Sequence, residues 1–165
     1  MNNLKFVCFI IISPIIYMNN ILKYQIIMFI VMTIVGICFN AMNALAFSIS
    51  HLYFSYGLFY GGCLMASNMI WAHEIIHYLV HDHINIGVFL IGLFLSLCFV
   101  FILRQQFFVN DEQYLKRMIS HHSTALTTSY KILEKTKDPK IKGLSKTIIE
   151  TQKKEIQYMK SLLNI

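Results

Sequence analysis

Long apolar runs with almost no charge fill the first two thirds of the chain, and polar, regularly patterned segments follow. The clearest run covers residues 84–103, carries no charge and ends at Arg104. A membrane-spanning helix needs about 20 apolar residues, which this run supplies. Residues 53–71 and 26–47 form two more runs, the second interrupted by Asn40 and Asn43. The pattern therefore predicts three transmembrane helices.

A shorter apolar run at residues 4–18 is broken by Pro14 and preceded by Lys5. This arrangement is typical of a signal peptide, but no A-x-A-like cleavage site follows it. We therefore expect residues 1–20 to be a signal-like segment or a marginal fourth span. Lys5 and Lys23 favour a cytoplasmic location for the start of the chain, which places the end on the non-cytoplasmic side after three spans. The loop at 72–83 has no Lys or Arg to hold it inside, so the charge pattern determines the orientation only weakly.

The last segment, residues 105–165, has the pattern of a helical hairpin. Asn110 can cap a helix whose first turn carries Asp111 and Glu112, where acids suit the helix dipole. Apolar residues then recur at spacings of three and four. Asp138 and Pro139 restart a helix as cap and first position. Because the turn between the two helices is short, we expect them to pack antiparallel.

Composition supports a membrane part joined to a water-exposed part. Hydrophobic residues make up 56% of the chain and charged residues 13%, against about 25% charged in an ordinary soluble domain. Between residues 24 and 103 only Glu74 and Asp82 are charged, whereas 105–165 contains eleven Lys or Arg and six Asp or Glu. We therefore divide the chain into 1–20, a transmembrane domain at 21–104 and a hairpin domain at 105–165.

Charge and cysteine content exclude several classes of function. The lysines are spread around the hairpin helices, which is typical of a solvated surface and not of a nucleic-acid site. The expected partner is the lipid bilayer, with no nucleic acid. The four cysteines, Cys8, Cys38, Cys63 and Cys98, lie inside apolar segments without a C-x-x-C pair. This pattern supports neither a disulfide framework nor a thiolate zinc site.

Two polar clusters interrupt the apolar faces of the hairpin. The first has helical spacing i, i+3 and i+4, and the second has spacing i, i+3 and i+7. Their members are Met118, His121 and His122, then Gln152, Glu155 and Met159. His121 and Glu155 should be level, since each lies roughly 25 Å from the turn at 1.5 Å per residue. A buried imidazole or carboxylate is costly without a partner, so we expect a hydrogen-bond network or a metal site.

The donor types decide which metal the hairpin would prefer. Imidazole together with thioether suits copper, especially Cu(I), better than magnesium or calcium. The alternative is a His, Glu and Gln network that only fixes helix packing. Acid–base catalysis is a further possibility, although the sequence offers no nucleophile and no evident substrate pocket.

A second candidate site lies at His73, Glu74 and His77, which match the pattern H-E-x-x-H. On a helix the two histidines face one way and can hold zinc, with the glutamate as general base. His81 and His83 extend the cluster. The alternatives are a zinc-dependent membrane protease, incidental metal binding and an ordinary interfacial loop. The chain is small and has no further catalytic motif, so we lean against an enzyme.

The hairpin motif resembles a known family. The strings Y-L-x-x-M-I-x-H-H-x-x-A and I-I-x-x-Q-x-x-E-I-x-x-M, with a D-P helix start between them, are similar to domain-of-unknown-function family 305. The similarity is close over 110–163 and extends from residue 22 for members with a three-helix membrane part. It implies a ferritin-like helical bundle and, for some members, copper binding through Met and His. The sequence departs at Ser120, usually proline, and at Thr128, often methionine in soluble members.

The expected protein is all-α, with three or possibly four transmembrane helices before a ferritin-like antiparallel hairpin. Its expected function is binding of a transition metal, copper, at the membrane surface, with zinc as the alternative metal. A two-helix hairpin has no second layer of its own, and domains this small are marginal. We therefore expect two hairpins to pair as a C₂ homodimer in a four-helix bundle. Gly57 and Gly61, in G-x-x-x-G spacing, could add a membrane contact.

Overall fold

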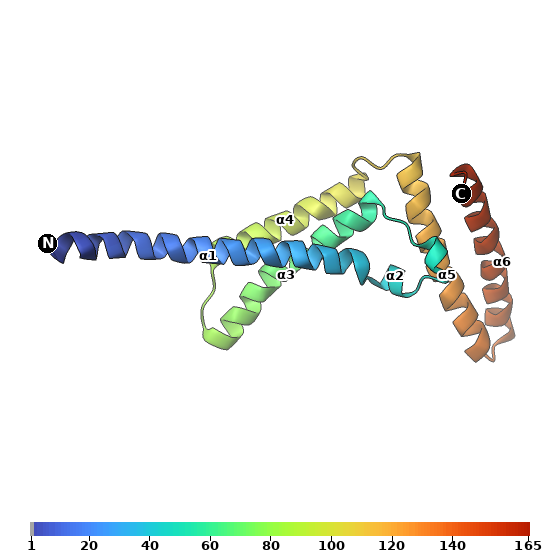
Figure 1. Ribbon diagram of the computed structural model, residues 1–165. Coiled ribbons are helices and arrows are strands. Elements are labelled where there is room, and N and C mark those ends of the chain that lie inside the picture. The colour runs from blue at the N-terminus through green and yellow to red at the C-terminus, as the bar shows by residue number, and fades with distance from the viewer. Residues whose placement is uncertain (1) are drawn as a thin grey trace.

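A computed structural model describes the backbone of residues 2–165 and the side chains from Asn20 onward. The described backbone is helical and contains no strand, which confirms the all-α prediction. The predicted signal-like segment at 1–20 falls almost wholly outside the part whose side chains are described. The chain forms a group of three long helices and a separate hairpin at one end of it (Figure 1).

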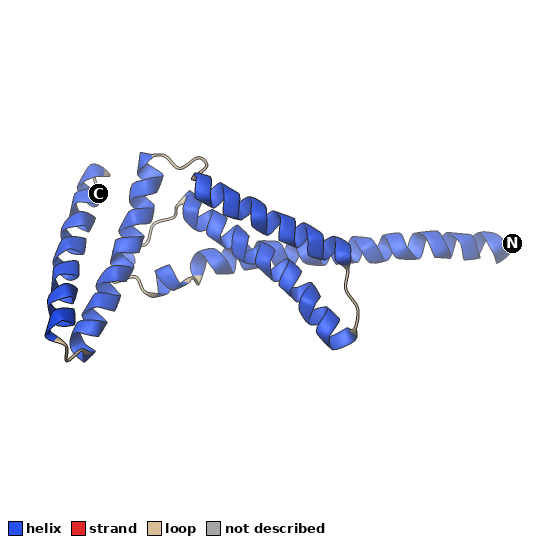
Figure 2. Cartoon of the chain, turned by 180° about the vertical axis from the view of Figure 1, so that it is seen from behind, coloured by secondary structure: helices blue, strands red, loops and turns tan. Residues whose placement is uncertain are grey.

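The three long helices are α1 (Asn2–Cys38), α3 (Tyr56–His81) and α4 (Ile86–Gln105). The chain reverses direction between α1 and α3 and again between α3 and α4 (Figure 1), and α3 packs against both α1 and α4. Helix α3 runs away from the hairpin end, and α4 runs back toward it. A short turn joins the two helices at the far end (Figure 2). The turn between α3 and α4 therefore lies at the end of the three-helix group opposite the hairpin.

Two segments are long and apolar enough to cross a membrane, Asn20–Ala44 and Ile86–Gln105. Only 11% of the most apolar window of each is buried, whereas the core helix of a soluble protein is mostly buried. Their exposed apolar surface favours a lipid environment. The third predicted span, within α3, is not among these segments. Two of the three expected spans are thus candidates by length and composition.

The closest contacts between helices are made at glycines. These glycines are not the pair with G-x-x-x-G spacing, Gly57 and Gly61. A Cβ on Gly62 would lie 2.7 Å from the Thr33 carbonyl oxygen of α1, and one on Gly92 would lie 2.8 Å from the Trp71 nitrogen. Only glycine permits such close approach of two helices. A Cβ on Gly61 would meet nothing within 4 Å. A Cβ on Gly57 would meet only the Arg117 side chain, at 3.8 Å, so the closest approaches between helix backbones lie elsewhere than at Gly57 and Gly61.

The hairpin consists of α5 (Asp111–Lys135) and α6 (Pro139–Leu162), as predicted. The Asn110 side chain accepts the Gln113 N–H at 2.9 Å, and Asp138 accepts the Lys140 N–H at 2.8 Å. Both predicted N-caps are confirmed. The buried faces of the two helices meet in one hydrophobic cluster, formed by Ile119, Leu126, Ile149, Ile156 and Met159.

The linker between α1 and α3 covers one side of α5. This linker, residues 39–55, includes α2 (Ala41–Ala44) and the short 3-10 helix η1 (Ile49–His51). Ser123 accepts the Phe47 N–H at 2.8 Å, and the Ser120 hydroxyl donates to the His51 carbonyl at 2.8 Å. Tyr53 packs on the hydrophobic cluster. The expectation that the hairpin has no second layer within its own chain is therefore wrong.

Candidate metal-binding sites

The hairpin brings His122 of α5 opposite Glu155 of α6. Their Nδ1 and Oε2 atoms lie 3.0 Å apart, with the His122 side chain 14% exposed and that of Glu155 46% exposed. The carboxylate lies off the direction of the ring nitrogen, so this is an ion-pair approach and not an aligned hydrogen bond. Gln152 donates to the same Glu155 oxygen at 3.2 Å. The two polar clusters are level, with His122 instead of His121 facing Glu155.

The other predicted ligands of the hairpin lie around this pair. Met159 is buried in the hydrophobic cluster, and the half-buried Met118 packs against it. His121 is exposed, and its ring centroid lies 5.9 Å from that of His122 in an edge-on arrangement. Among the described side chains, no three His, Cys, Asp or Glu residues converge on a point where they could hold an ion. The closest donors to one another are therefore His122 and Glu155, and Met118 and Met159 lie one helical turn from them along α5 and α6.

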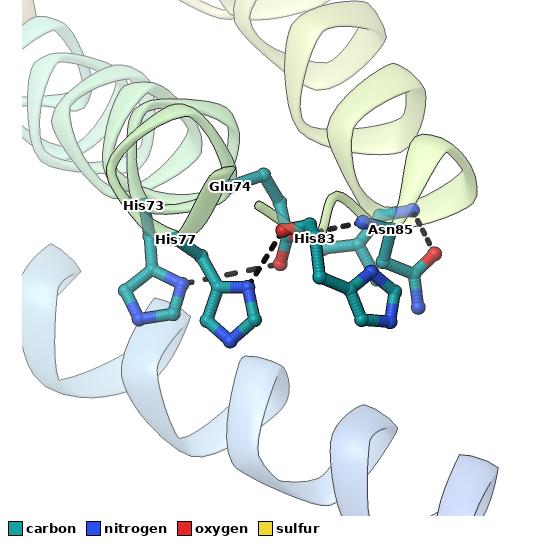
Figure 3. Close-up of polar contacts among 6 residues, drawn as sticks. His73, Glu74, His77, His83 and Asn85 are labelled. Atoms are coloured by element: carbon teal, nitrogen blue, oxygen red, sulfur yellow. Dashed lines mark hydrogen bonds and ion pairs between the residues drawn. The ribbon is translucent and has the colours of Figure 1, made fainter. Parts of the chain in front are cut away.

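The second cluster lies at the end of α3, far from the hairpin. The rings of His73 and His77 hang side by side from α3 toward α1 (Figure 3). The His77 Nδ1 lies 2.8 Å from the His83 carbonyl oxygen. A carbonyl can only accept, so this contact assigns the proton of neutral His77 to Nδ1. Its Nε2 is then free to accept a proton or bind a metal.

The Glu74 carboxylate lies beside the His73 ring and fixes the turn into α4 (Figure 3). Its side chain is 8% exposed, and its Oε2 accepts the Asn85 N–H at 2.9 Å. The other oxygen lies 3.9 Å from the His73 Nδ1, which is too long for a hydrogen bond. Asn85 in turn caps α4 by accepting the Val88 N–H at 3.2 Å. Glu74 thus has a clear structural role, unlike the exposed general base of a peptidase.

A cavity of about 320 Å³ adjoins the His73 and His77 rings. His81 stacks on His77 at 4.7 Å between centroids but does not line this cavity, whereas His83 does. Helix α1 contributes Asn20, Tyr24 and Gln25 to its wall. Gln25 is not among the site residues predicted from the sequence. Its signal was an amide within an apolar run, where polar side chains are rare and often functional.

A titratable residue of the linker lies beside the hairpin site. His51 Nδ1 is 3.0 Å from the hydroxyl of Ser123, the residue that follows His122. Burial, and secondly the positive charge of Lys160, lower the pKa of His51 below its usual value. Burial also lowers the pKa of Arg117, whose guanidinium contacts the Met42 sulfur. No periodic pattern in the linker predicts its contact with α5.

Comparison with known proteins places the chain in a family. An uncharacterized protein of Acanthamoeba polyphaga mimivirus is 34% identical over 149 residues, which cover 89% of this chain and 94% of that protein. The family profile described as Domain of unknown function (DUF305) matches residues 105–163. The chain belongs to the DUF305 family. The longer match to the viral relative shows that similarity to that protein reaches beyond the hairpin into the apolar helices. No solved structure matches the chain.

Proposed function

We propose that this DUF305 protein is a membrane-anchored protein that binds a copper ion on its hairpin. The observation that carries the proposal is the approach of His122 to Glu155 at 3.0 Å across two helices. A half-buried imidazole nitrogen without an aligned hydrogen bond is costly, and a metal ion would use its lone pair. Met159 lies in the hydrophobic cluster and Met118 packs against it, each one helical turn along the chain from one member of the pair.

The donor set suits Cu(I). Soft thioether and imidazole donors favour this ion over hard cations. His122, Met118 and Met159 would hold the ion, and His121 would join by turning inward from its exposed position. Glu155 would supply negative charge, with Gln152 orienting its carboxylate. Such orienting partners of ligands commonly change metal affinity tenfold or more.

We further propose that α1, α3 and α4 all span the bilayer. Helix α3 has 26 residues and is about 39 Å long at 1.5 Å per residue, which exceeds a hydrocarbon core of about 30 Å. Its polar last turns, with His73 and Glu74, then lie at the membrane boundary. Lys23 lies toward the end opposite the hairpin, so the positive-inside rule favours a hairpin on the non-cytoplasmic side.

The outer face of α6 supports pairing of two hairpins. Leu144 and Leu162 are 57% and 51% exposed and lie on the same face as Glu155. A second copy packed there would bury both leucines and complete a ferritin-like four-helix bundle. It would also bring two pairs of His122 and Glu155 toward one interface. The proposed assembly is therefore a C₂ homodimer.

Copper competition with the full-length protein in detergent tests the proposed function. Purified protein competes with a chromophoric chelator for Cu(I). One double variant carries His121→Ala with His122→Ala. The other carries Met118→Leu with Met159→Leu. We expect each double variant to lose at least tenfold in affinity, about 1.4 kcal/mol. His81→Ala is the matched control, because it removes an exposed histidine far from the hairpin, and should bind like the unaltered protein.

The second candidate function is a structural module, and the Gln152 to Glu155 hydrogen bond beside His122 favours it. In that case the network only fixes the register of α5 and α6. Unchanged Cu(I) affinity in both double variants, together with a lowered melting temperature of the histidine variant, would establish the structural function in place of copper binding.

A further inference from the structure

The cavity at the turn between α3 and α4 gathers polar groups from three parts of the chain. Gln25 and Tyr24 come from α1, His73, Glu74 and His77 from α3, and His83 from the turn. His83 and Asn85 of the turn between α3 and α4 line the cavity, and this turn lies at the end of the helical part opposite α5 and α6 (Figure 1). Its chemistry is therefore separate from that of the hairpin.

Two of these groups are buried without a hydrogen-bond partner among the described residues. Gln25 is only 8% exposed, and its Oε1 finds no hydrogen-bond donor among residues 20–165. The Nδ1 atom of His73 is also buried without a partner in that part of the chain. Unpaired buried acceptors cost free energy, about 1–3 kcal/mol each. A ligand that accepts lone pairs would remove this cost.

The charge of the cavity also favours a bound cation. The Glu74 side chain is 8% exposed and forms no ion pair with a Lys or Arg among the described side chains. Its contacts are the Asn85 N–H and, at 3.9 Å, the His73 ring. A buried carboxylate with so little compensation favours a cation nearby.

The imidazoles supply suitable ligands for that cation. His73 and His77 lie at i and i+4 on one helix face, and both rings point toward α1 (Figure 3). The bond of His77 Nδ1 to the His83 carbonyl leaves Nε2 available, which is the usual arrangement of a metal-binding histidine with its supporting hydrogen bond. The ring centroids of His73 and His77 are 6.3 Å apart, so small side-chain rotations would let both nitrogens reach one ion.

We propose that this cavity binds a divalent transition-metal ion of the Zn²⁺ class, with His73, His77 and His83 as ligands. The three rings do not already converge on one point among the described side chains, so binding requires each side chain to rotate toward the ion. The donors are nitrogen and oxygen without sulfur, which favours Zn²⁺ over the Cu(I) proposed for the hairpin. Glu74 is a positioning residue, since its Oε2 is held by Asn85 and its charge offsets that of the ion. Gln25 faces the site from α1 and ties that helix to the bound ion.

Zinc titration of the full-length protein in detergent tests this proposal. The background carries His121→Ala and His122→Ala, which removes the hairpin histidines and makes the result independent of the copper proposal. Metal-free protein competes with a chromophoric zinc chelator for Zn²⁺ alone. We expect one bound Zn²⁺ per chain, and at least a tenfold loss of affinity when His73→Asn and His77→Asn are added.

The controls separate ligand loss from loss of fold. His81→Ala should leave zinc affinity within about twofold, because His81 stacks on His77 outside the cavity. Co²⁺ in the same background should give the visible absorption bands of a nitrogen-ligated site, which requires no variant in the cavity. Absence of bound Zn²⁺ and of Co²⁺ bands, or unchanged affinity in a folded His73→Asn and His77→Asn protein, would overturn the proposal.

Discussion

At the residue scale, one buried hydroxyl holds the linker on the hairpin. Ser123 is fully buried and accepts the Phe47 N–H at 2.8 Å. In Ser123→Ala that N–H loses its acceptor, which should destabilise the docked linker by about 1–3 kcal/mol. Hydrogen exchange of amides 46–52, followed by mass spectrometry, should become faster. Thr128→Ala is the control, because its exposed hydroxyl bonds only to carbonyls of its own helix, and equal acceleration in both variants would refute the role of Ser123.

Acid should loosen the same contact through His51. Its pKa is lowered in the folded chain, first by burial and then by Lys160, from an ordinary value of 6.5. The unfolded chain therefore binds the proton more readily, and docking loses stability as the pH falls below 6.5 toward the folded pKa. Above 6.5 this residue adds no pH dependence.

Limited proteolysis of the linker at pH 7.5 and pH 5.5 would measure this effect. The unaltered protein should be cut faster at the lower pH, with rates corrected for the protease by a denatured substrate. His51→Gln cannot take up a proton and should lose most of this difference. A variant that keeps the full pH dependence would assign it to another group.

Features set by neighbouring residues were predictable from the sequence. The caps at Asn110 and Asp138 depend on local chemistry, and the height of His122 and Glu155 follows from helical rise and a short turn. The contacts of Ser120 and Ser123 with the linker were not predictable, since they join residues 69 to 76 positions apart. A serine inside a helix gives no periodic signal of what it will meet.

At the element scale, glycine packing between α1 and α3 gives a test with an internal control. In Gly62→Ala the new Cβ would lie 2.7 Å from the Thr33 carbonyl oxygen, so the helices must separate. We expect destabilisation of about 1–3 kcal/mol, as for overpacked cores. Gly61→Ala adds the same methyl group where nothing lies within 4 Å and should be neutral or slightly stabilising.

Denaturation in mixed detergent micelles, followed by circular dichroism, would compare the two glycine variants. Equal midpoints would show that α1 and α3 do not approach each other at Gly62. The G-x-x-x-G rule predicted Gly57 and Gly61 because it depends only on residue spacing within one helix. The observed contact needs Gly36 and Gly62 from two helices, and sequence periodicity does not indicate which helices pair.

At the scale of the whole molecule, the exposed leucines of α6 should mediate dimer formation. Replacing Leu144 and Leu162 with Glu would place two charges in the proposed interface. We expect the mass in detergent to fall from that of a dimer to that of a monomer, with helix content unchanged. Lys146→Glu, a charge change at an exposed position of the same helix, is the control. A protein that is monomeric before any substitution would contradict the assembly.

The all-α architecture and the division into apolar and polar parts were predictable, since both follow from composition and helical periodicity. The second layer over α5 was not predictable, because the linker that forms it has no helical repeat of its own. The residues of the cavity between α1 and α3 were likewise predictable from the sequence only in part. The His73 and His77 pair follows a known spacing, whereas Gln25 reaches them from 48 residues away through tertiary packing.

Copper binding by histidine and methionine of the hairpin has a direct spectroscopic signature. X-ray absorption at the copper edge, on full-length protein loaded with one equivalent of Cu(I), would measure it. We expect imidazole nitrogen and thioether sulfur in the first coordination shell, with the sulfur contribution lost in the Met118→Leu and Met159→Leu variant. A shell without sulfur, or one that the methionine and His121 and His122 substitutions leave unchanged, would contradict it.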